Sequence, residues 1–463
     1  MSSPPTTIPL QLDAQYDEMM PGPQVEEGEM CCGNRDGVDD RAESLESMSS
    51  TSPLKADVCL GHSIQLPVEL WVTVIDYLAD EWVDVFLFDQ TYESRLRELG
   101  KVCRGWHARC LFRTWERLVV EKPIEKEEAY RLINTLNQNP ERCYTIKTVS
   151  FKFQKKSMSI FGMFAICMAR KLPRTERLAF WRCDWDTGQL HAQVFIHITL
   201  AFESVTVLEL KYVRFPSAVV FGRLMRALPR LSSLKCWDVS FDKHSDAAGR
   251  IWELHPLRLD DAELWDSDDV ANFLVLIGAQ LRHLSWRSLS SDMCLKLLAV
   301  TAESLSSIHL ELAYFTARKR FPPNFVIDLT LAVNLRVLSI VSNLDDFDRV
   351  ARILCRAFLP KMTELTIVSI HHYTGTFHLS IIQDKLDAVD KDSYAFLDQA
   401  FSSRQYPTLK KVTFNLRCEI WRSELMGTIS EVSWGSHLSS RLPALHTSGR
   451  LVPYVSVRME EHT

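Results

Sequence analysis

A six-residue pattern that recurs between residues 146 and 414 constrains the fold more than any other feature of this sequence. Each copy, here called a hexad, places apolar residues at its first, fourth and sixth positions. The hexads are Ile146-Val149-Phe151, Thr175-Leu178-Phe180, Val205-Leu208-Leu210, Leu231-Leu234-Cys236, Leu254-Leu257-Leu259, Leu281-Leu284-Trp286, Leu305-Ile308-Leu310, Leu335-Leu338-Ile340, Met362-Leu365-Ile367 and Leu409-Val412-Phe414. Thr175 is the one departure from this pattern. The fourth positions lie 23 to 30 residues apart, except for a last interval of 47 residues.

Repetition at this period predicts a stack of similar units, because one short unit cannot bury its own apolar face. The alternation between the fourth and sixth positions is typical of a strand with one face inward. Apolar residues at helical spacing follow several hexads, for example Phe221, Leu224, Met225 and Leu228. We therefore expect an α/β protein with a parallel sheet. The alternative is a set of separate α/β units whose leucines share a spacing by chance.

A strand followed by a helix, repeated, resembles the leucine-rich repeat family. The resemblance implies an irregular solenoid over residues 144–418, with the parallel sheet on its concave face. The family's Asn or Cys three residues after the hexad is present only at Cys183 and Asn343. The longest interval contains an insertion, including the charged stretch from Gln383 to Asp392. Residues 419–463 lose the pattern, so we expect them to cap the stack and to be loose beyond Leu445.

Residues 63–120 show helical spacing instead. Pro67 suits the first turn of a helix, where its missing N–H is no loss. Three apolar helix faces follow: Leu70, Trp71, Val74, Ile75 and Leu78; Leu96, Leu99, Val102, Cys103 and Trp106; and a shorter one of Leu111, Phe112 and Trp115, with Leu118 beyond it. Helices this short bury little surface, so we expect the module to need a partner. An ordinary helical subdomain without such a partner is the alternative.

The segment Leu66-Pro67-x-Glu69-Leu70, followed by Val102-Cys103-Arg104-x-Trp106, resembles the F-box. The resemblance implies docking onto the Skp adaptor of an SCF (Skp–cullin–F-box) ubiquitin ligase. The residues that it assigns to the adaptor are Leu66, Pro67, Glu69, Leu70, Ile75, Leu78, Leu99, Val102, Cys103 and Trp106. Residues 79–95 are longer than the family's usual link between the first two helices. Either the first helix continues there or an extra apolar element packs against it.

Charge is unevenly distributed along the chain, which has a net charge of −6. Residues 1–60 hold 12 acidic and 3 basic side chains, so the remainder is nearly neutral and gives no reason to expect nucleic acid as a partner. We expect residues 1–62, rich in Ser and Pro, to be a disordered acidic tail. We expect residues 121–143 to form a linker helix.

The composition also bears on location. No uncharged apolar run approaches the ~18 residues that a membrane helix needs, and the start of the sequence lacks a signal-peptide layout. The 12 cysteines show no disulfide framework. We therefore expect no membrane partner and a cytoplasmic and/or nuclear protein with reduced thiols.

No catalytic motif is found. The sequence lacks a glycine-rich phosphate loop and a Gly-x-Ser-x-Gly elbow, and it contains only 16 glycines. His371-His372 has no third ligand at metal spacing, and the pairs Asp268-Asp269 and Asp345-Asp346 are placed to cap helices. We expect no enzyme activity, no cofactor and no metal site. An enzyme whose groups converge in space from distant repeats is the alternative.

The concave side is expected to bind another protein. The residues beside the fourth and sixth hexad positions that should point there are Arg177, Trp181, Lys211, Trp237, Arg258, Asp260, His283, Arg287, His309 and Glu311. Trp and Arg dominate binding hot spots on rigid scaffolds, so the expected target-binding residues are Trp181, Trp237, Arg258, Arg287 and His309. An edge tryptophan packed under a loop is the alternative for both Trp residues. The whole pattern predicts a substrate-recognition subunit of an SCF-type ligase; a repeat scaffold without a ubiquitin role is the other interpretation.

Overall fold

The structure is a computed structural model. It describes residues 67–85, 91–121, 126–153, 158–185, 193–243, 257–288, 290–312, 327–372, 379–389, 391–421 and 430–460. The chain divides into two compact units, Met1–Gln65 and Leu66–Thr463, and all described residues lie in the second. The expected disordered tail and Leu66 lie outside the described residues.

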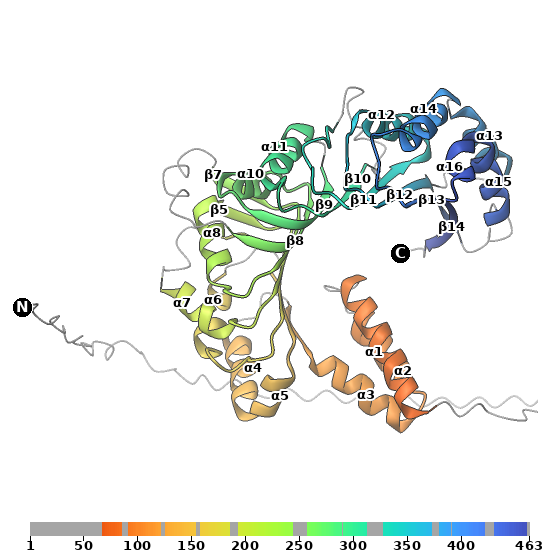
Figure 1. Ribbon diagram of the computed structural model, residues 1–463. Helices are drawn as coiled ribbons and strands as arrows, with labels where there is room; N and C mark the ends of the chain where they lie inside the picture. The colour runs from red at the N-terminus through yellow and green to blue at the C-terminus, as the bar shows by residue number, and fades with distance from the viewer. Residues whose placement is uncertain are drawn as a thin grey trace, which may run out of the picture. The chain divides into compact units, whose positions relative to one another are not determined.

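Twelve of the described strands form one sheet in which each strand is parallel to its neighbours and follows in chain order (Figure 1). The strands are β1 Arg117–Glu121, β2 Thr148–Lys152, β3 Arg177–Trp181, β4 Val207–Lys211, β6 Ser233–Trp237, β8 Arg258–Trp265, β9 Gln280–Arg287, β10 Ser307–Glu311, β11 Val337–Asn343, β12 Glu364–His372, β13 Lys411–Trp421 and β14 Leu451–Glu460. β5 Arg214–Ser217 and β7 Ser240–Lys243 form a second, two-stranded sheet. The expectation of an α/β protein with a parallel sheet is confirmed.

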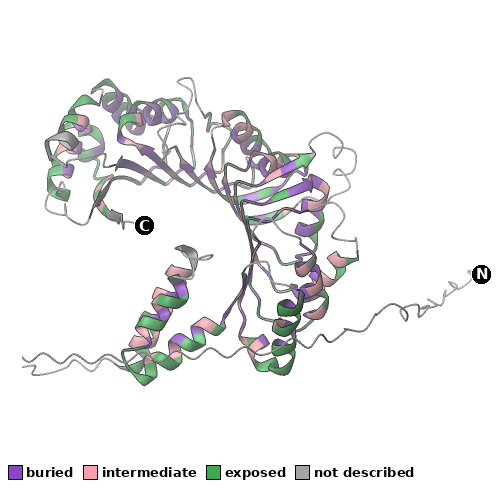
Figure 2. Cartoon of the chain, turned by 180° about the vertical axis from the view of Figure 1, so that it is seen from behind, coloured by how far each residue is buried: buried purple, intermediate pink, exposed green. Residues whose placement is uncertain are grey.

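Helices lie in the crossovers, because parallel neighbours must be joined across the sheet. They are α4 Lys126–Gln138, α5 Pro140–Thr145, α6 Ser159–Cys167, α7 Val194–Ala201, α8 Ala218–Arg226, α10 Asp268–Leu276, α11 Ser291–Thr301, η1 Leu344–Asp346, α12 Phe347–Arg356, α13 Leu379–Ala388, α14 Lys391–Ser402, α15 Glu431–Arg441 and α16 Pro443–Thr447. The sheet curves, and these helices lie on the outer side of the curve (Figure 1). Buried residues follow the strands and the helix sides that face the sheet (Figure 2). The opposite side of the sheet is called the open face below.

The hexads form the core. Their fourth positions are aligned across the sheet, as when Val149 lies opposite Leu178 and Leu178 opposite Leu208. The sixth positions are aligned in the same way, and the rings of Phe151 and Phe180 stack with their centroids 5.6 Å apart. Burying each such side chain contributes about 1.5–3 kcal/mol. The repeats are therefore held together mainly by two ladders of apolar side chains that run across the strands.

One expected hexad, Leu254-Leu257-Leu259, is wrong. Ala262 on β8 lies opposite Leu234 on one side and Leu284 on the other. The hexad on this strand is therefore Leu259-Ala262-Leu264, and all three of its residues are buried. The small Ala262 gives a weaker apolar signal than Leu257, which is why the sequence pattern favours the earlier position. With this correction the neighbouring intervals are 28 and 22 residues.

The N-terminal helices are α1 Val68–Val85, α2 Thr91–Leu99 and α3 Arg104–Trp115. The first helix thus continues well past Leu78, one of the two expected possibilities. The face expected to be continuous from Leu96 to Trp106 is divided between α2 and α3. Leu118, inside the expected helical domain of residues 63–120, lies in β1, so the sheet begins before residue 144. The expected linker helix corresponds to α4 and α5, which form the crossover between β1 and β2.

The C-terminal segment is ordered by the sheet. β14 pairs in parallel with β13 along all 10 of its residues, so the expectation of a loose chain beyond Leu445 is wrong. Trp434 on α15 is buried, and its indole Nε1 donates a hydrogen bond to Phe414 O at 3.0 Å. These contacts explain why the chain stays ordered after the hexads end. The charged insertion lies mostly in α13 and α14, and residue 390 is outside the described residues.

Candidate protein-binding surfaces

Helices α1–α3 have a small core of their own. Ile75, Ala79, Tyr92, Leu96 and Cys110 are buried together. Trp82, Leu99 and Trp106 pack against this core, and the rings of Trp71 and Trp106 lie 4.9 Å apart. The assignment of Ile75 to an adaptor contact is therefore wrong, because its side chain faces inward and is only 1% exposed.

The other side of α1 is apolar and exposed. Leu70, Val74 and Tyr77 are spaced so that they share one helix face, and their exposed fractions are 50%, 42% and 69%. Further large apolar side chains exposed in these helices and their connections are Val68, Val102, Leu111, Phe112 and Trp115. An apolar stripe on a small module, in contrast to scattered exposed residues, is typical of an interaction site.

The other expected adaptor residues that the structure describes fall into two groups. Pro67, Glu69, Leu70, Val102 and Cys103 are exposed, whereas Leu78, Leu99 and Trp106 are half-buried. The exposed apolar residues that the sequence assignment did not include are Val68, Val74, Tyr77, Leu111, Phe112 and Trp115. Their helical spacing was visible, but spacing alone does not show which apolar face of a helix is covered.

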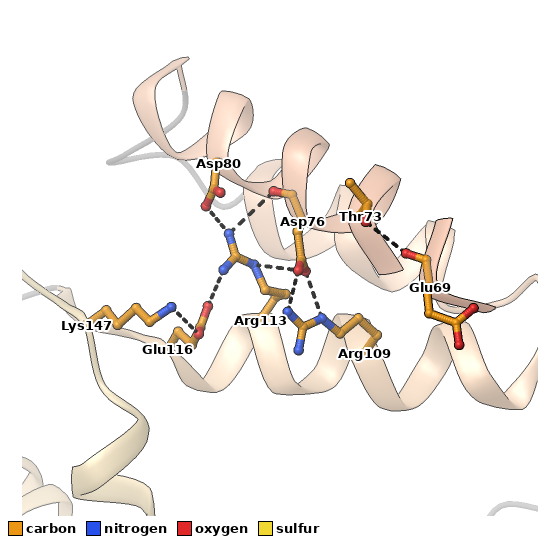
Figure 3. Close-up of polar contacts among 8 residues, drawn as sticks. All are labelled: Glu69, Thr73, Asp76, Asp80, Arg109, Arg113, Glu116 and Lys147. Carbon is orange, nitrogen blue, oxygen red and sulfur yellow. Dashed lines mark hydrogen bonds and ion pairs between the residues drawn. The ribbon is translucent and has the colours of Figure 1, made fainter. Parts of the chain in front are cut away.

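An ion-pair network centred on the nearly buried Arg113 and Glu116 connects these helices to Lys147, just before β2 (Figure 3). Arg113 Nη1 lies 2.6 Å from Glu116 Oε2, and the other guanidinium nitrogens contact Asp80 and Asp76 on α1. Glu116 Oε1 lies 2.8 Å from Lys147 Nζ, just before β2. Burial by itself lowers the pKa of Arg113, but Glu116 and Asp80 outweigh it and the pKa is raised. The network therefore holds a charged guanidinium at the junction.

Backbone contacts reinforce this junction. The N–H groups of Lys147 and Thr148 both donate to Glu116 O, at 2.8 and 3.0 Å. Beside them is a polar cleft of about 330 Å³. Tyr92 and Arg117 line this cleft, and the Arg117 guanidinium lies 4.8 Å from the centre of the Tyr92 ring. Burial raises the pKa of Tyr92 to about 12. Side chains of both charge signs line the cleft, and several of them form ion pairs with one another. This arrangement is typical of a structural junction.

The open face carries a continuous row of tryptophan and charged residues, one on each of seven strands. The row, here called the tryptophan–cation row, consists of Lys152, Trp181, Lys211, Trp237, Trp265, Arg287 and Glu311. Each residue directly follows the sixth position of its hexad, so its side chain points away from the apolar core. All seven side chains are half-buried.

Cation–π contacts connect neighbouring members of the row. Lys152 Nζ lies 4.2 Å from the centre of the Trp181 ring, and Lys211 Nζ lies 4.3 Å from that of Trp237. The Arg287 guanidinium lies 4.6 Å from the centre of the Trp265 ring. Each such contact contributes about 0.5–1 kcal/mol at an exposed site and more when desolvated. The row is therefore a preorganised surface whose cationic groups have defined positions.

A left-handed corner ends four of these strands in the same way. Arg182, Tyr212, Asp238 and Asp266 each follow a member of the row and have φ angles of 54°, 55°, 52° and 46°. Each backbone N–H donates to the carbonyl of the next row member, as from Tyr212 to Trp237 O at 2.8 Å. Since none of these residues is glycine, the sequence gives no direct signal for the corner. The repeated corner sets where each row residue stands.

The row contains three of the five expected target-binding residues, Trp181, Trp237 and Arg287. His309 lies outside the row, two residues before Glu311 on β10. Its Nδ1 is 3.0 Å from Ser339 Oγ. Burial, together with Arg417, lowers the pKa of His309. The assignment of Arg258 to this surface is wrong: it lies at the start of β8, opposite Gln280, because the hexad was placed too early.

Two members of the row, Lys152 and Trp265, were missed. Trp265 follows the sixth position of the corrected hexad, as Trp181 and Trp237 follow theirs. Its position was therefore recoverable from the pattern once β8 was placed correctly. Lys152 follows the first hexad in the same way, but a lysine beside an apolar strand carries no distinctive signal.

The open face beside the tryptophan–cation row carries paired charges. Arg177 Nη1 lies 3.0 Å from Glu209 Oε1, and Lys235 Nζ lies 3.9 Å from Glu263 Oε2. Burial raises the pKa of Glu263, and Lys235 opposes that effect. The charges of these two pairs therefore largely balance one another.

No protein-family model matches this chain, and no curated protein matches it either. Within the described ranges, no helix is long and apolar enough to cross a membrane. The same ranges contain no cluster of three or more His, Cys, Asp or Glu side chains that could hold a metal ion.

Proposed function

We propose that this protein is the substrate-recognition subunit of an SCF-type ubiquitin ligase. In this proposal, α1–α3 form an F-box that docks onto the Skp adaptor, and the sheet with its helices is a leucine-rich-repeat-like solenoid that holds a target protein. The observation that supports it most strongly is the exposed apolar face of Leu70, Val74 and Tyr77 on a helix whose other face forms a core. Such a face is stabilised when a partner covers it.

The chain would act without catalytic groups of its own. The other subunits of the ligase would carry the ubiquitin, and this chain would raise the local concentration of the target beside it. That role needs the two binding surfaces to be mechanically connected. The contacts of Glu116 with Arg113 and Lys147 provide such a connection between α3 and β2.

Binding of purified Skp adaptor to the full chain tests the proposal. We expect the wild-type chain to retain the adaptor, and the double variant Leu70→Asp/Tyr77→Asp to lose it. The matched control is Phe396→Asp on α14, which adds a charge at another exposed apolar site that is 59% exposed. Circular dichroism checks that each variant is folded. No adaptor binding, or equal binding by the double variant, would overturn the proposal.

A repeat scaffold without a ubiquitin role is the second candidate. The buried core of α1–α3 favours it, because a module with its own core does not need an adaptor to stay folded. Mass spectrometry of proteins that co-purify with the full chain separates the two candidates. The ligase subunit would bring down adaptor and cullin together and lose both in the Leu70→Asp/Tyr77→Asp variant. The scaffold would bring down neither.

A further inference from the structure

We infer that the loops leading into β11, β12 and β13 form a binding site for an acidic amphipathic segment of a partner protein. The site is here called the basic–apolar rim, and all six of its residues are exposed: Leu331, Val333, Arg336, Phe358, Lys361 and Lys410. These residues stand on loops, outside both the open face and α1–α3. The inference therefore does not depend on the proposed function.

The apolar part of the rim consists of Leu331, Val333 and Phe358, with exposed fractions of 43%, 48% and 49%. Leu331 and Phe358 occupy equivalent positions of neighbouring repeats, four residues before the buried Leu335 and Met362. Equivalent positions of stacked repeats lie side by side. The described loops that lead into β3, β4, β6, β9 and β10 carry no exposed large apolar side chain. The apolar exposure thus forms a local patch, which is typical of an interaction site.

Hydrogen bonds join the loops of the rim. Lys361 Nζ donates to Asn334 Oδ1 at 2.6 Å, which connects the loops before β12 and β11. The N–H of Thr363 donates to Arg336 O at 2.8 Å, and that of Lys410 donates to Thr363 O at 2.9 Å. Arg336 and Lys410 are therefore two strand spacings apart, or ~9.6 Å. Because these loops are already fixed, a partner that binds them loses little freedom in ordering them.

The rim carries more positive than negative charge. Residues 328–337, 355–364 and 403–411 contain six basic and two acidic side chains. Among the described residues, neither Arg336 nor Lys410 forms an ion pair. Their exposed cationic groups are therefore accessible to the carboxylates of a partner.

The acidic residues near the rim do not cancel this charge. Asp328 Oδ1 accepts the N–H of Thr330, so this carboxylate is engaged within its own loop. Glu364 lies opposite Lys411 in the register of β12 and β13, and it balances a lysine outside the rim. Glu303, in the preceding loop, is the third carboxylate. Six basic side chains against these three leave a net charge of +3.

Charge and apolar exposure together define the chemistry of the partner. An acidic segment with apolar side chains complements both features. A uniformly anionic lipid surface fits less well, because the three carboxylates are interspersed among the cations. We therefore assign the rim to a protein segment.

The test uses the full chain and fluorescein-labelled peptides followed by fluorescence anisotropy. The probe is three repeats of Leu-Glu-Gln-Leu-Phe-Gln-Glu, which place apolar and acidic side chains on different faces of a helix. We expect the probe to bind, and to bind more weakly as salt is added. Two control peptides, one with Lys for each Glu and one with Ser for each Leu and Phe, should bind at least about tenfold more weakly.

Variants of the chain locate the binding. Lys410→Glu and Phe358→Ser should each weaken binding of the probe by about tenfold or more. The matched controls are Arg223→Glu on α8 and Ile196→Ser on α7, which change an exposed cation and an exposed apolar residue outside the rim. Both controls should bind the probe like the wild-type chain. If Lys410→Glu proves unfolded by circular dichroism, Arg336→Glu must show the loss instead.

Several results would overturn the inference. They are no binding of the probe, equal binding of either control peptide, or tighter binding of phosphatidylserine vesicles than of the probe. Loss of binding in the Leu70→Asp/Tyr77→Asp variant would place the peptide on α1 and would also overturn it. Peptide binding without retention of the adaptor would overturn the proposed function alone.

Discussion

Arg113 and Glu116 form an ion pair of 2.6 Å at the point where α3 ends and β1 begins, with side chains that are only 7% and 10% exposed. The two residues are only three positions apart in the sequence, yet their contacts link three parts of the fold. Arg113 also reaches Asp80 on α1, and Glu116 also reaches Lys147 before β2. The chain contains a matched surface pair, Glu98 and Lys101, with the same spacing and the same distance of 2.6 Å.

These two pairs allow the effect of burial to be measured. We expect Glu116→Gln to lower the free energy of unfolding by about 1–3 kcal/mol, because it leaves a buried guanidinium and Lys147 without that carboxylate. Glu98→Gln should cost less than about 1 kcal/mol, since its pair is solvated. Urea unfolding monitored by circular dichroism measures both. Equal losses would show that the junction contributes no more than a surface contact.

The left-handed corner at Tyr212 leads to a second prediction, which concerns the stability of a glycine variant. Tyr212 has a φ of 55°, and its side chain is 52% exposed. A non-glycine residue in this conformation costs roughly 1–2 kcal/mol, whereas glycine costs about 0.5–1 kcal/mol through its greater freedom when unfolded. Tyr212→Gly should therefore stabilise the protein by up to about 1 kcal/mol.

The control for this prediction is Tyr130→Gly on α4. The two tyrosines are similarly exposed, at 52% and 50%. In a helix the same change should destabilise by about 0.5 kcal/mol or more. Melting temperatures of the two variants should thus move in opposite directions, and a decrease for both would contradict the assigned conformation of Tyr212.

The third prediction concerns the stability that the aromatic part of the core provides. Phe180 is fully buried and lies 5.6 Å from Phe151 and 4.9 Å from Phe161, measured between ring centroids. Phe180→Ala should lower the free energy of unfolding by about 3–5 kcal/mol, because it removes apolar contact and leaves a cavity. Phe358→Ala, at an exposed position, should cost about 0.5 kcal/mol. A small effect at Phe180 would argue against the stacked ladder of sixth positions.

His309 makes stability depend on pH. Burial lowers its pKa in the folded protein below the ordinary value of 6.5. The unfolded chain then binds more protons as the pH falls through 6.5, so this group contributes a loss of stability on acidification and none at higher pH. His309→Gln should therefore reduce the loss of stability between about pH 8 and 5.

The matched control is His283→Gln, at an exposed position on the preceding strand. Denaturant midpoints at several pH values measure the effect for both variants. We expect the curve of His309→Gln to be flatter than the wild-type curve, and we compare it with that of the exposed control. Identical curves for the wild type and His309→Gln would show that His309 is not buried.

Periodicity predicted much of the architecture. Strands around Val149, Leu178 and Leu208 follow directly from apolar alternation, and their nearly equal spacing implied parallel neighbours. Trp181, Trp237 and Arg287 were placed on a common surface by the same rule, since the residue after a buried sixth position must point the other way. The F-box and leucine-rich-repeat assignments, and the functions that they imply, remain predictions.

Other features depended on contacts between distant segments. Ala262 can be identified as the fourth hexad position of β8 only from its pairing with Leu234 on one side and Leu284 on the other. Ile75 and Val74 are neighbours on the same helix, but packing against α2 and α3 buries the first and leaves the second exposed.

The sequence by itself determined the repeated alternation of strands and helices, because apolar periodicity is a property of each segment alone. The tertiary structure decided the alignment of β8, the buried side of α1, the pairing of β14 and the cation–π contacts between strands. The physical reason is that each of these depends on which segments pack together, and packing is settled by the shape and volume of side chains that lie far apart in the chain.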